Sequence, residues 1–275
     1  MKAFQALFDQ LDRMNGTNAK VTALADHFRS TPAEDAAWAL HLMLGKRRRR
    51  LITGRRLRDI LRDRGGLPEW LIADCHGQVG DSAETISLLW PAIRDQIQPQ
   101  STDLPPINAE QPLHWWMETL LPAIGALKDT EQADAVLSLW HALPDERHFI
   151  VNKLLTGGFR VGVSTGLISR ALARAFALED TLVVQRLMGG FTPSAAAFLA
   201  LSRPQDPEEQ QSSGVPYPFF LASPLEPERV LETPASAWRV EWKWDGIRGQ
   251  LIHRGTGVYL WSRGEELVND SFPEL

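Results

Sequence analysis

Three ionisable side chains near the end of the chain, Glu241, Lys243 and Asp245, alternate with apolar residues. In a β-strand, this period of two places the three on one face and the apolar residues on the other. The chain has six lysines against 23 arginines, and Lys243 is the only lysine in its C-terminal third. Because a partly desolvated lysine can lose its proton, whereas arginine stays charged, Lys243 could act as a nucleophile. The alternative is a half-buried strand whose solvated charges contribute little.

Strands must position these side chains, and the pattern after residue 237 is typical of strands. We expect strands at Trp238–Asp245, Ile247–His253 and Val258–Ser262, with a turn at Gly255-Thr256-Gly257. A segment this short, with exposed strand edges, cannot easily form a closed sheet domain by itself. It therefore resembles the first part of a larger β-containing domain.

The first two hundred residues show helical rather than strand periodicity. Thr31-Pro32-Ala33-Glu34 has the pattern of a capping box, Gly45 is a plausible helix stop, and Ser164 is a good N-cap. The expected helices lie at or around Phe4–Leu11, Val21–Phe28, 33–44, Leu57–Leu61, Pro68–His76, Ser82–Trp90, Leu113–Leu121, Glu131–Leu143, Asp145–Leu155, Thr165–Ala177 and 193–201.

A basic tract follows Gly45 on a chain whose net charge is −5. Clustered cations of this kind are typical of a surface that binds a polyanion. The alternative is a solvated helix face or a basic loop. The residues of the tract that we expect to contact the polyanion are Lys46, Arg47, Arg48, Arg49 and Arg50.

A second candidate for phosphate binding is the link Thr156–Ser164, which precedes an expected helix. Backbone amides, the helix N-terminus and the guanidinium of Arg160 could converge there on a phosphate. Gly162 and Ser164 belong to the same candidate site. The simpler alternative is that Gly157 and Gly158 end one helix before a short link starts the next.

The composition suggests two domains joined by a polar linker. Residues 202–214 are polar, aperiodic and proline-bearing, as interdomain linkers are. We expect a helical domain at 1–201, a linker at 202–215 and the N-terminal part of a second domain at 216–275. The single cysteine, Cys75, excludes an internal disulfide and a Cys-x-x-Cys zinc site, and we expect it to be a small core residue. No apolar run is long enough to span a membrane, and a cytoplasmic protein is expected.

The stretch Lys243-x-Asp245-Gly246-x-Arg248 resembles the nucleotidyltransferase motif of ATP-dependent DNA ligases, which RNA ligases and mRNA capping enzymes share. Ser262–Glu266 looks like the second ligase motif, and Pro218–Ala222 resembles the entry to the catalytic core. Leu155–Ala177 is similar to the end of the helical DNA-binding domain of large ligases. The resemblance is closest in style to bacterial multidomain ligases. It implies an all-α DNA-binding domain followed by the first antiparallel strands of an α+β nucleotidyltransferase domain.

The resemblance implies a role for each motif residue. Lys243 would attack the α-phosphate of ATP and carry AMP, in a site where partial burial helps to neutralise the amine, with Mg²⁺ on the phosphates. Glu241 would accept from the adenine amino group. Arg248 would hold the ribose or phosphate, Arg263 would contact AMP or the nick 5′-phosphate, and Asp245 would act close to the lysine. No protein metal ligand is predicted.

The family carries further motifs beyond those seen here, so we expect this chain to bind nicked duplex DNA as a monomer without sealing it. Helicase and nuclease partners and a nucleoid location are what the resemblance implies for such bacterial ligases. A different interpretation is a non-catalytic helical DNA-binding module with a vestigial tail. Capping enzymes and RNA ligases do not normally carry such a helical domain, and the zinc cysteines of NAD-dependent ligases are absent.

Overall fold

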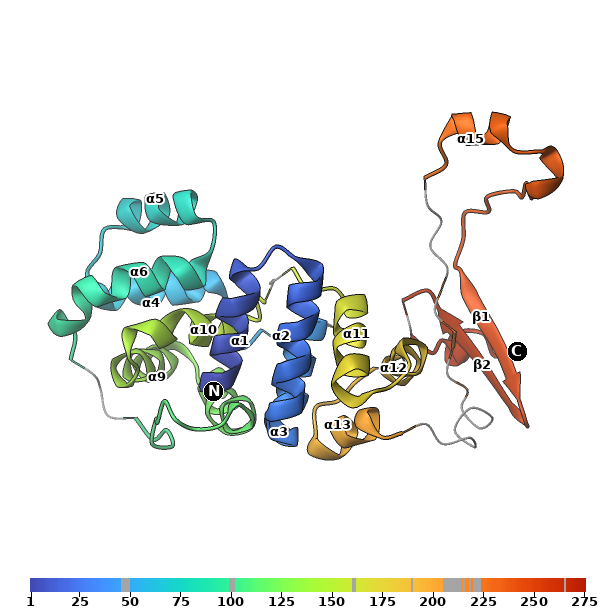
Figure 1. The fold of residues 1–275 in the computed structure, drawn as a ribbon. Helices are drawn as coiled ribbons and strands as arrows, with labels where there is room; N and C mark the ends of the chain where they lie inside the picture. The colour runs from blue at the N-terminus through green and yellow to red at the C-terminus, as the bar shows by residue number, and fades with distance from the viewer. Residues whose placement is uncertain are drawn as a thin grey trace. The chain divides into compact units, whose positions relative to one another are not determined.

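The computed structural model describes residues 1–45, 50–98, 102–159, 162–188, 190–204, 214, 216–217, 219, 224–264 and 266–275. By packing, the chain divides into a first unit, Met1–Ala177 with Thr192–Ser202, and a second unit, Leu178–Phe191 with Arg203–Leu275. The predicted linker at 202–215 falls mostly outside the described residues and stays a prediction. The predicted fold class is confirmed, because the described part is mostly helical and ends in a small antiparallel sheet (Figure 1).

In the residues described, all the regular secondary structure of the first unit is helical. Its elements are α1 (Lys2–Arg13), α2 (Thr17–Ser30), α3 (Ala33–Leu44), α4 (Gly54–Gly65), α5 (Glu69–Val79), α6 (Ser82–Ile93), the 3₁₀ turn η1 (Arg94–Gln96), α7 (Leu113–Trp115), the π-helical η2 (Trp116–Leu120), α8 (Leu121–Ala126), α9 (Asp129–Ala142), α10 (Asp145–Thr156), α11 (Thr165–Phe176) and α13 (Ala195–Ser202).

Amphipathic periodicity explains why these helices form, since the residues spaced three and four apart are the buried ones. In α1 these are Phe4, Leu7, Phe8 and Leu11. Helix α2 packs along α11, and α6 packs against both α4 and α10 (Figure 1). Three tryptophans, Trp90, Trp116 and Trp140, are completely buried in the core.

Two local predictions, the capping box at Thr31 and the burial of Cys75, were wrong, whereas the helix stop at Gly45 is confirmed. The capping box at Thr31 does not form, because Pro32 occupies the N-cap of α3 and the Thr31 hydroxyl lies 3.4 Å from His27 Nδ1. Cys75 is only partly buried, on a helix of which Ile72 is the residue that enters the core. Gly45 does end α3, in the left-handed conformation at φ 66° that glycine adopts without steric cost.

The second unit contains α12 (Asp180–Leu187), α15 (Pro227–Glu232), the 3₁₀ turns η3 (Ala235–Ala237) and η4 (Asn269–Ser271), and strands β1 (Gly249–Arg254) and β2 (Gly257–Ser262). The strands form an antiparallel hairpin in which Gly249 pairs with Ser262 and Arg254 with Gly257. The expected turn is therefore confirmed. Helices α12 and α15 were not predicted.

The predicted strand at Trp238–Asp245 was wrong for the structure described. Those residues are assigned to no strand, and Val240, Trp242 and Trp244 are 93%, 86% and 85% exposed. A strand needs a hydrogen-bonded neighbour, and the sheet described here contains only β1 and β2. The alternating pattern alone could not supply that neighbour.

Asp35, in the first turn of α3, joins that helix to the start of α7. Its carboxylate accepts hydrogen bonds from the backbone N–H of Leu113 (3.0 Å) and of His114 (2.9 Å). The ring Nδ1 of His114 lies 2.7 Å from the same carboxylate. Burial alone would raise the pKa of Asp35, but these hydrogen bonds hold the pKa below its usual value. The carboxylate therefore anchors a helix start that its own chain segment does not cap.

Asp35→Asn is expected to lower the free energy of unfolding by about 1–3 kcal/mol at pH 7, because a charged acceptor is removed. Because the pKa of Asp35 is lower in the folded than in the unfolded chain, its carboxylate stabilises the fold fully above the unfolded pKa of about 3.9. This stabilisation is lost as the pH falls through the folded pKa. Urea unfolding at pH 7, 5 and 3 should therefore show the wild type and variant converging below about pH 4. Asp12→Asn, at an exposed carboxylate, is the control. A difference that stayed constant from pH 7 to pH 3 would contradict the assignment.

Candidate nucleic-acid interface

The two stretches predicted to bind DNA, far apart in sequence, meet in the first unit. The backbone N–H groups of Leu51 and Ile52, just after the basic tract, both donate to the carbonyl of Leu155 in the last turn of α10, at 3.2 and 3.1 Å. Helix α10 then ends at Gly157, whose φ of 69° is left-handed. The end of the basic tract is therefore fixed beside the start of the 156–164 link.

Two adjoining hollows mark this place. The larger, of about 760 Å³, is lined by the ends of α3, α5 and α10 and the starts of α4 and α6, and includes Arg50, Asp81, Lys153 and Gly158. The smaller, of about 480 Å³, is lined by the end of α3 and the start of α11, with Gly162 and Ser164. Gly45 and Phe159 line both hollows. We call the larger hollow the groove.

Of the predicted DNA-binding residues, Arg50, Gly162 and Ser164 are described and Lys46, Arg47, Arg48, Arg49 and Arg160 lie outside the described residues. Arg50 is exposed in the groove. The Ser164 hydroxyl accepts from the Leu167 N–H at 3.3 Å, which confirms it as the N-cap of α11. The structure thus gathers the three described residues around the two hollows.

Gly162 adopts a left-handed backbone conformation that favours glycine. Its φ is +60°, and a Cβ there would lie 3.0 Å from the ammonium nitrogen of Lys20. The Lys20 ammonium also donates to the Gly162 carbonyl at 3.4 Å. Lys20 lies near the start of α2 and was not a predicted site residue, since nothing in the pattern of α2 indicates a contact so distant in sequence.

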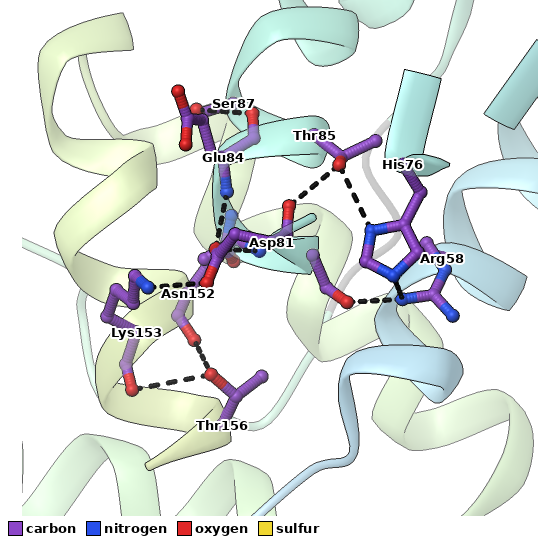
Figure 2. A network of polar contacts seen from close by, with 11 residues as sticks. Arg58, His76, Asp81, Glu84, Thr85, Ser87, Asn152, Lys153 and Thr156 are labelled. Carbon is purple, nitrogen blue, oxygen red and sulfur yellow. Dashed lines mark hydrogen bonds and ion pairs between the residues drawn. The ribbon is translucent and has the colours of Figure 1, made fainter. Parts of the chain in front are cut away.

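Asp81 and Lys153 form the polar wall of the groove (Figure 2). The Asp81 carboxylate caps α6, accepting from the N–H groups of Ala83 (2.9 Å) and Glu84 (3.1 Å). Its other oxygen lies 2.5 Å from Lys153 Nζ on α10. Burial alone would raise the pKa of Asp81, but the bonds from Lys153 and the two amides hold the pKa below its usual value. Sequence reasoning missed both residues, because their pairing depends on how α6 packs on α10.

The remainder of the network fixes the hydrogen positions of His76 (Figure 2). The Thr85 hydroxyl donates to the Asp81 carbonyl at 2.7 Å, so it can accept from His76 Nδ1 at 3.4 Å. His76 Nε2 is then free to accept from the Arg58 guanidinium at 3.2 Å. Arg58 also donates to the Ser82 hydroxyl. This assigns the Nδ1-protonated tautomer to His76 and ties α4 to the start of α6.

Three arginines of α4 make polar contacts within the first unit. Arg56 donates to the Asp129 carbonyl at 2.6 Å, and Arg64 pairs with Asp134 at 2.6 Å. Arg62 contacts the carboxylates of Asp59 and Asp63. Arg56 and Arg64 therefore hold α4 against α9, whereas Arg62 pairs within its own helix. All three are poor candidates for binding a ligand.

The residues predicted around the lysine lie in the second unit and are only partly brought together. Glu241, Lys243 and Asp245 are exposed, and the described residues do not bury the lysine amine. The Arg263 N–H donates to the Arg248 carbonyl at 2.9 Å, so these two arginines are neighbours across the mouth of the hairpin. No contact described for this part of the chain joins Lys243 to either arginine.

Comparison with known proteins identifies the first unit. The family model described as "DNA ligase N terminus" matches residues 1–173, more than half of the chain. The chain belongs to this DNA ligase family. The match covers the basic tract, the link and both hollows, and it stops before the predicted nucleotidyltransferase residues.

Curated relatives of this DNA ligase family member are longer than the chain. A protein named "Probable DNA ligase" from Anaeromyxobacter sp. is 28% identical over 235 residues, which are 80% of this chain and 43% of the relative. "DNA ligase 2" of Methanosarcina acetivorans is 30% identical over 48% of this chain and 23% of the relative. A "Probable DNA ligase" of Opitutus terrae is 31% identical over 48% of this chain and 16% of the relative. The chain thus spans less than half of each of these proteins.

Within the described ranges, no helix is long and apolar enough to cross a membrane. The same residues contain no group of three or more His, Cys, Asp or Glu side chains placed to hold a metal ion.

Proposed function

We propose that the first unit binds nicked duplex DNA by its phosphates, around the groove and the adjoining hollow. The observation that carries the proposal is that Arg50, the last residue of the basic tract, lines one groove with the start of the 156–164 link, within the segment that matches the ligase family. Cations beside exposed backbone N–H groups suit phosphate oxygens, and such contacts position a protein without reading base sequence. Arg50 and the start of α11 would contact the backbone of the duplex.

We further propose that the second unit contributes the adenylation chemistry of an ATP-dependent ligase. The Lys243 amine would attack the α-phosphorus of ATP, forming a P–N bond as pyrophosphate leaves with the P–O bond electrons. The AMP group would pass to the 5′-phosphate of the nick. The 3′-hydroxyl would then displace AMP and form the phosphodiester bond. Membership of the DNA ligase family supports this proposal.

The residues present suit a nucleotide better than they suit a bound metal. Arg248 and Arg263, adjacent across the hairpin, offer guanidinium groups to a phosphate, and Glu241 offers an acceptor to an adenine amino group. Mg²⁺ binds phosphates with only one or two protein carboxylates, so no three-residue cluster is required for it to act on ATP. We assign it no protein ligand.

The exposed lysine also supports the proposal that this chain alone does not seal nicks. A lysine acts as a nucleophile when its amine is desolvated or placed beside other cations, and Lys243 is exposed in the described structure. Covering of this face by further protein would supply that environment.

The expected result for the 275-residue chain is binding to a nicked duplex without ligation, and at most trace labelling by α-³²P-ATP. Fluorescence anisotropy, a gel-based sealing assay and a protein label that resists alkali but is released by acid, as a P–N bond is, measure the three properties. Any trace label should disappear in Lys243→Arg, with nick binding unchanged. Stoichiometric labelling at the rate of a complete ligase would contradict the proposed inactivity. Absence of any label would favour a non-catalytic DNA-binding module, and absence of DNA binding at 50 mM salt would reject the role of the first unit.

A further inference from the structure

An acidic side chain lines the groove in which we place a polyanion. The Asp81 side chain is 34% exposed, so it is open to whatever occupies the groove. A carboxylate there opposes phosphate binding unless a cation compensates it. The Lys153 ammonium, 2.5 Å away, is that cation.

The position of Lys153 is well defined. Its side chain is 12% exposed, and its ammonium also lies 5.2 Å from the centre of the Phe149 ring. Both contacts hold the ammonium against the groove wall, where its charge and that of Asp81 cancel. The pair therefore adds no net charge to a surface whose described exposed cation is Arg50.

We propose that Asp81 restrains the DNA affinity of the groove by holding the Lys153 ammonium in a neutral pair that a DNA phosphate must compete with. The inference rests on the proposed DNA binding by the first unit. Asp81 is a positioning residue in this scheme, and Lys153 is an additional phosphate-binding residue whose charge is withheld in the free protein.

Asparagine at position 81 would separate the electrostatic effect from the structural one. Asn is as good an N-cap as Asp, so α6 keeps its cap while the carboxylate charge disappears. A freed lysine that gains one phosphate contact raises the magnitude of the salt slope by about 0.9. At 0.1 M salt, an increase of about 0.9 in the slope corresponds to about eightfold tighter binding.

The test uses the 275-residue chain and a fluorescent nicked duplex, with anisotropy titrations from 50 to 300 mM KCl. Asp81→Asn is expected to bind about eightfold more tightly at 0.1 M salt, with the steeper salt dependence. Lys153→Met leaves the carboxylate unpaired and should bind several-fold more weakly. Lys153→Arg should keep wild-type affinity within about twofold. The double variant Asp81→Asn/Lys153→Met should return close to the wild-type value, because both charges are gone.

Asp134→Asn is the matched control. It removes a carboxylate from another ion pair of the same unit, with Arg64 at 2.6 Å, and Asp134 is not among the residues that line the groove. Its DNA affinity should stay within about twofold of the wild type, and its salt slope should stay within about 0.2 of the wild-type slope. A change equal to that of Asp81→Asn would mean that net charge alone is responsible, and would overturn the proposal.

Thermal midpoints from circular dichroism separate loss of folding from loss of binding. If Asp81→Asn does not fold, Asp81→Ser, which also provides an uncharged N-cap, replaces it. Weaker or unchanged binding by a folded variant at position 81 would overturn the inference while leaving DNA binding by the first unit intact. Failure of the wild type itself to bind would instead reject the proposed function, and the inference with it.

Discussion

Replacing Lys46, Arg47, Arg48, Arg49 and Arg50 together by alanine is expected to weaken binding to a nicked duplex by about 60- to 500-fold at 0.1 M salt. Each phosphate that the protein neutralises adds about 0.9 to the salt slope, so a tract that neutralises two or three phosphates supplies about 60- to 500-fold in affinity at that salt. Arg50 is exposed in the groove, and the segment after it is fixed against α10. Arg50, the described residue of the tract, is therefore held beside the groove.

The measurement is the dissociation constant of the 275-residue chain from 50 to 300 mM KCl, for the wild type and the alanine variant. A smaller tract variant, Arg48→Ala/Arg49→Ala, removes two positive charges and can be compared with a control that removes two positive charges elsewhere. That control is Arg64→Ala/Arg94→Ala, at or just beyond the C-terminal ends of α4 and α6, whose N-terminal ends line the groove. Twelve helical residues span about 18 Å, so these arginines lie far from it. Equal salt slopes for the tract variant and the wild type would remove the tract from the interface.

Trp140→Ala is expected to lower the free energy of unfolding by about 3–5 kcal/mol, the usual cost of removing a fully buried aromatic side chain. Trp140 has no exposed surface, and its ring lies 5.2 Å from that of Trp90, centre to centre. Its Nε1 donates to Asn152 Oδ1 at 2.9 Å, and its carbonyl accepts from His148 Nε2 at 2.8 Å. The residue thus joins α6, α9 and α10, two of which line the groove.

Urea denaturation at pH 7, followed by far-ultraviolet circular dichroism, measures this destabilisation as a lower midpoint. Trp140→Phe keeps most of the ring and removes the N–H donor, which leaves the buried Asn152 oxygen without its partner. The free energy of unfolding of that variant should fall by about 1–2 kcal/mol. If both variants were destabilised by less than about 1 kcal/mol, Trp140 would not be the centre of this core.

Local pattern was sufficient for most of the helices. Helix α1 has its apolar residues three and four apart, and those are the ones buried. Gly45 was recognised as a stop because glycine adopts the left-handed conformation at a helix end, and Ser164 as a start because its hydroxyl accepts from the N–H of Leu167 in the first turn. Predictions of this kind succeed because the hydrogen bonds and the burial they describe are set by residues close in sequence.

Predictions that needed a distant partner were less successful. The alternation at 238–245 indicated a strand, but the described sheet gives these residues no neighbour to pair with. At the start of α3 the N-cap residue is Pro32 and not Thr31 as expected. Asp35 instead caps the start of α7, almost eighty residues further along the chain. The fixed φ of proline and the packing of α3 near α7 decided these cases, and neither effect appears as a periodic pattern.

Residue patterns were enough to predict a helical region with a basic tract and a glycine-bearing link, followed along the chain by a lysine motif. Packing of the helices was needed to bring Arg50 of the tract and Gly158 of the link into one groove, and to pair Asp81 with Lys153 between α6 and α10. The physical reason is distance along the chain. Helix formation depends on neighbours within a turn or two, whereas a groove depends on which helix ends the hydrophobic core brings together.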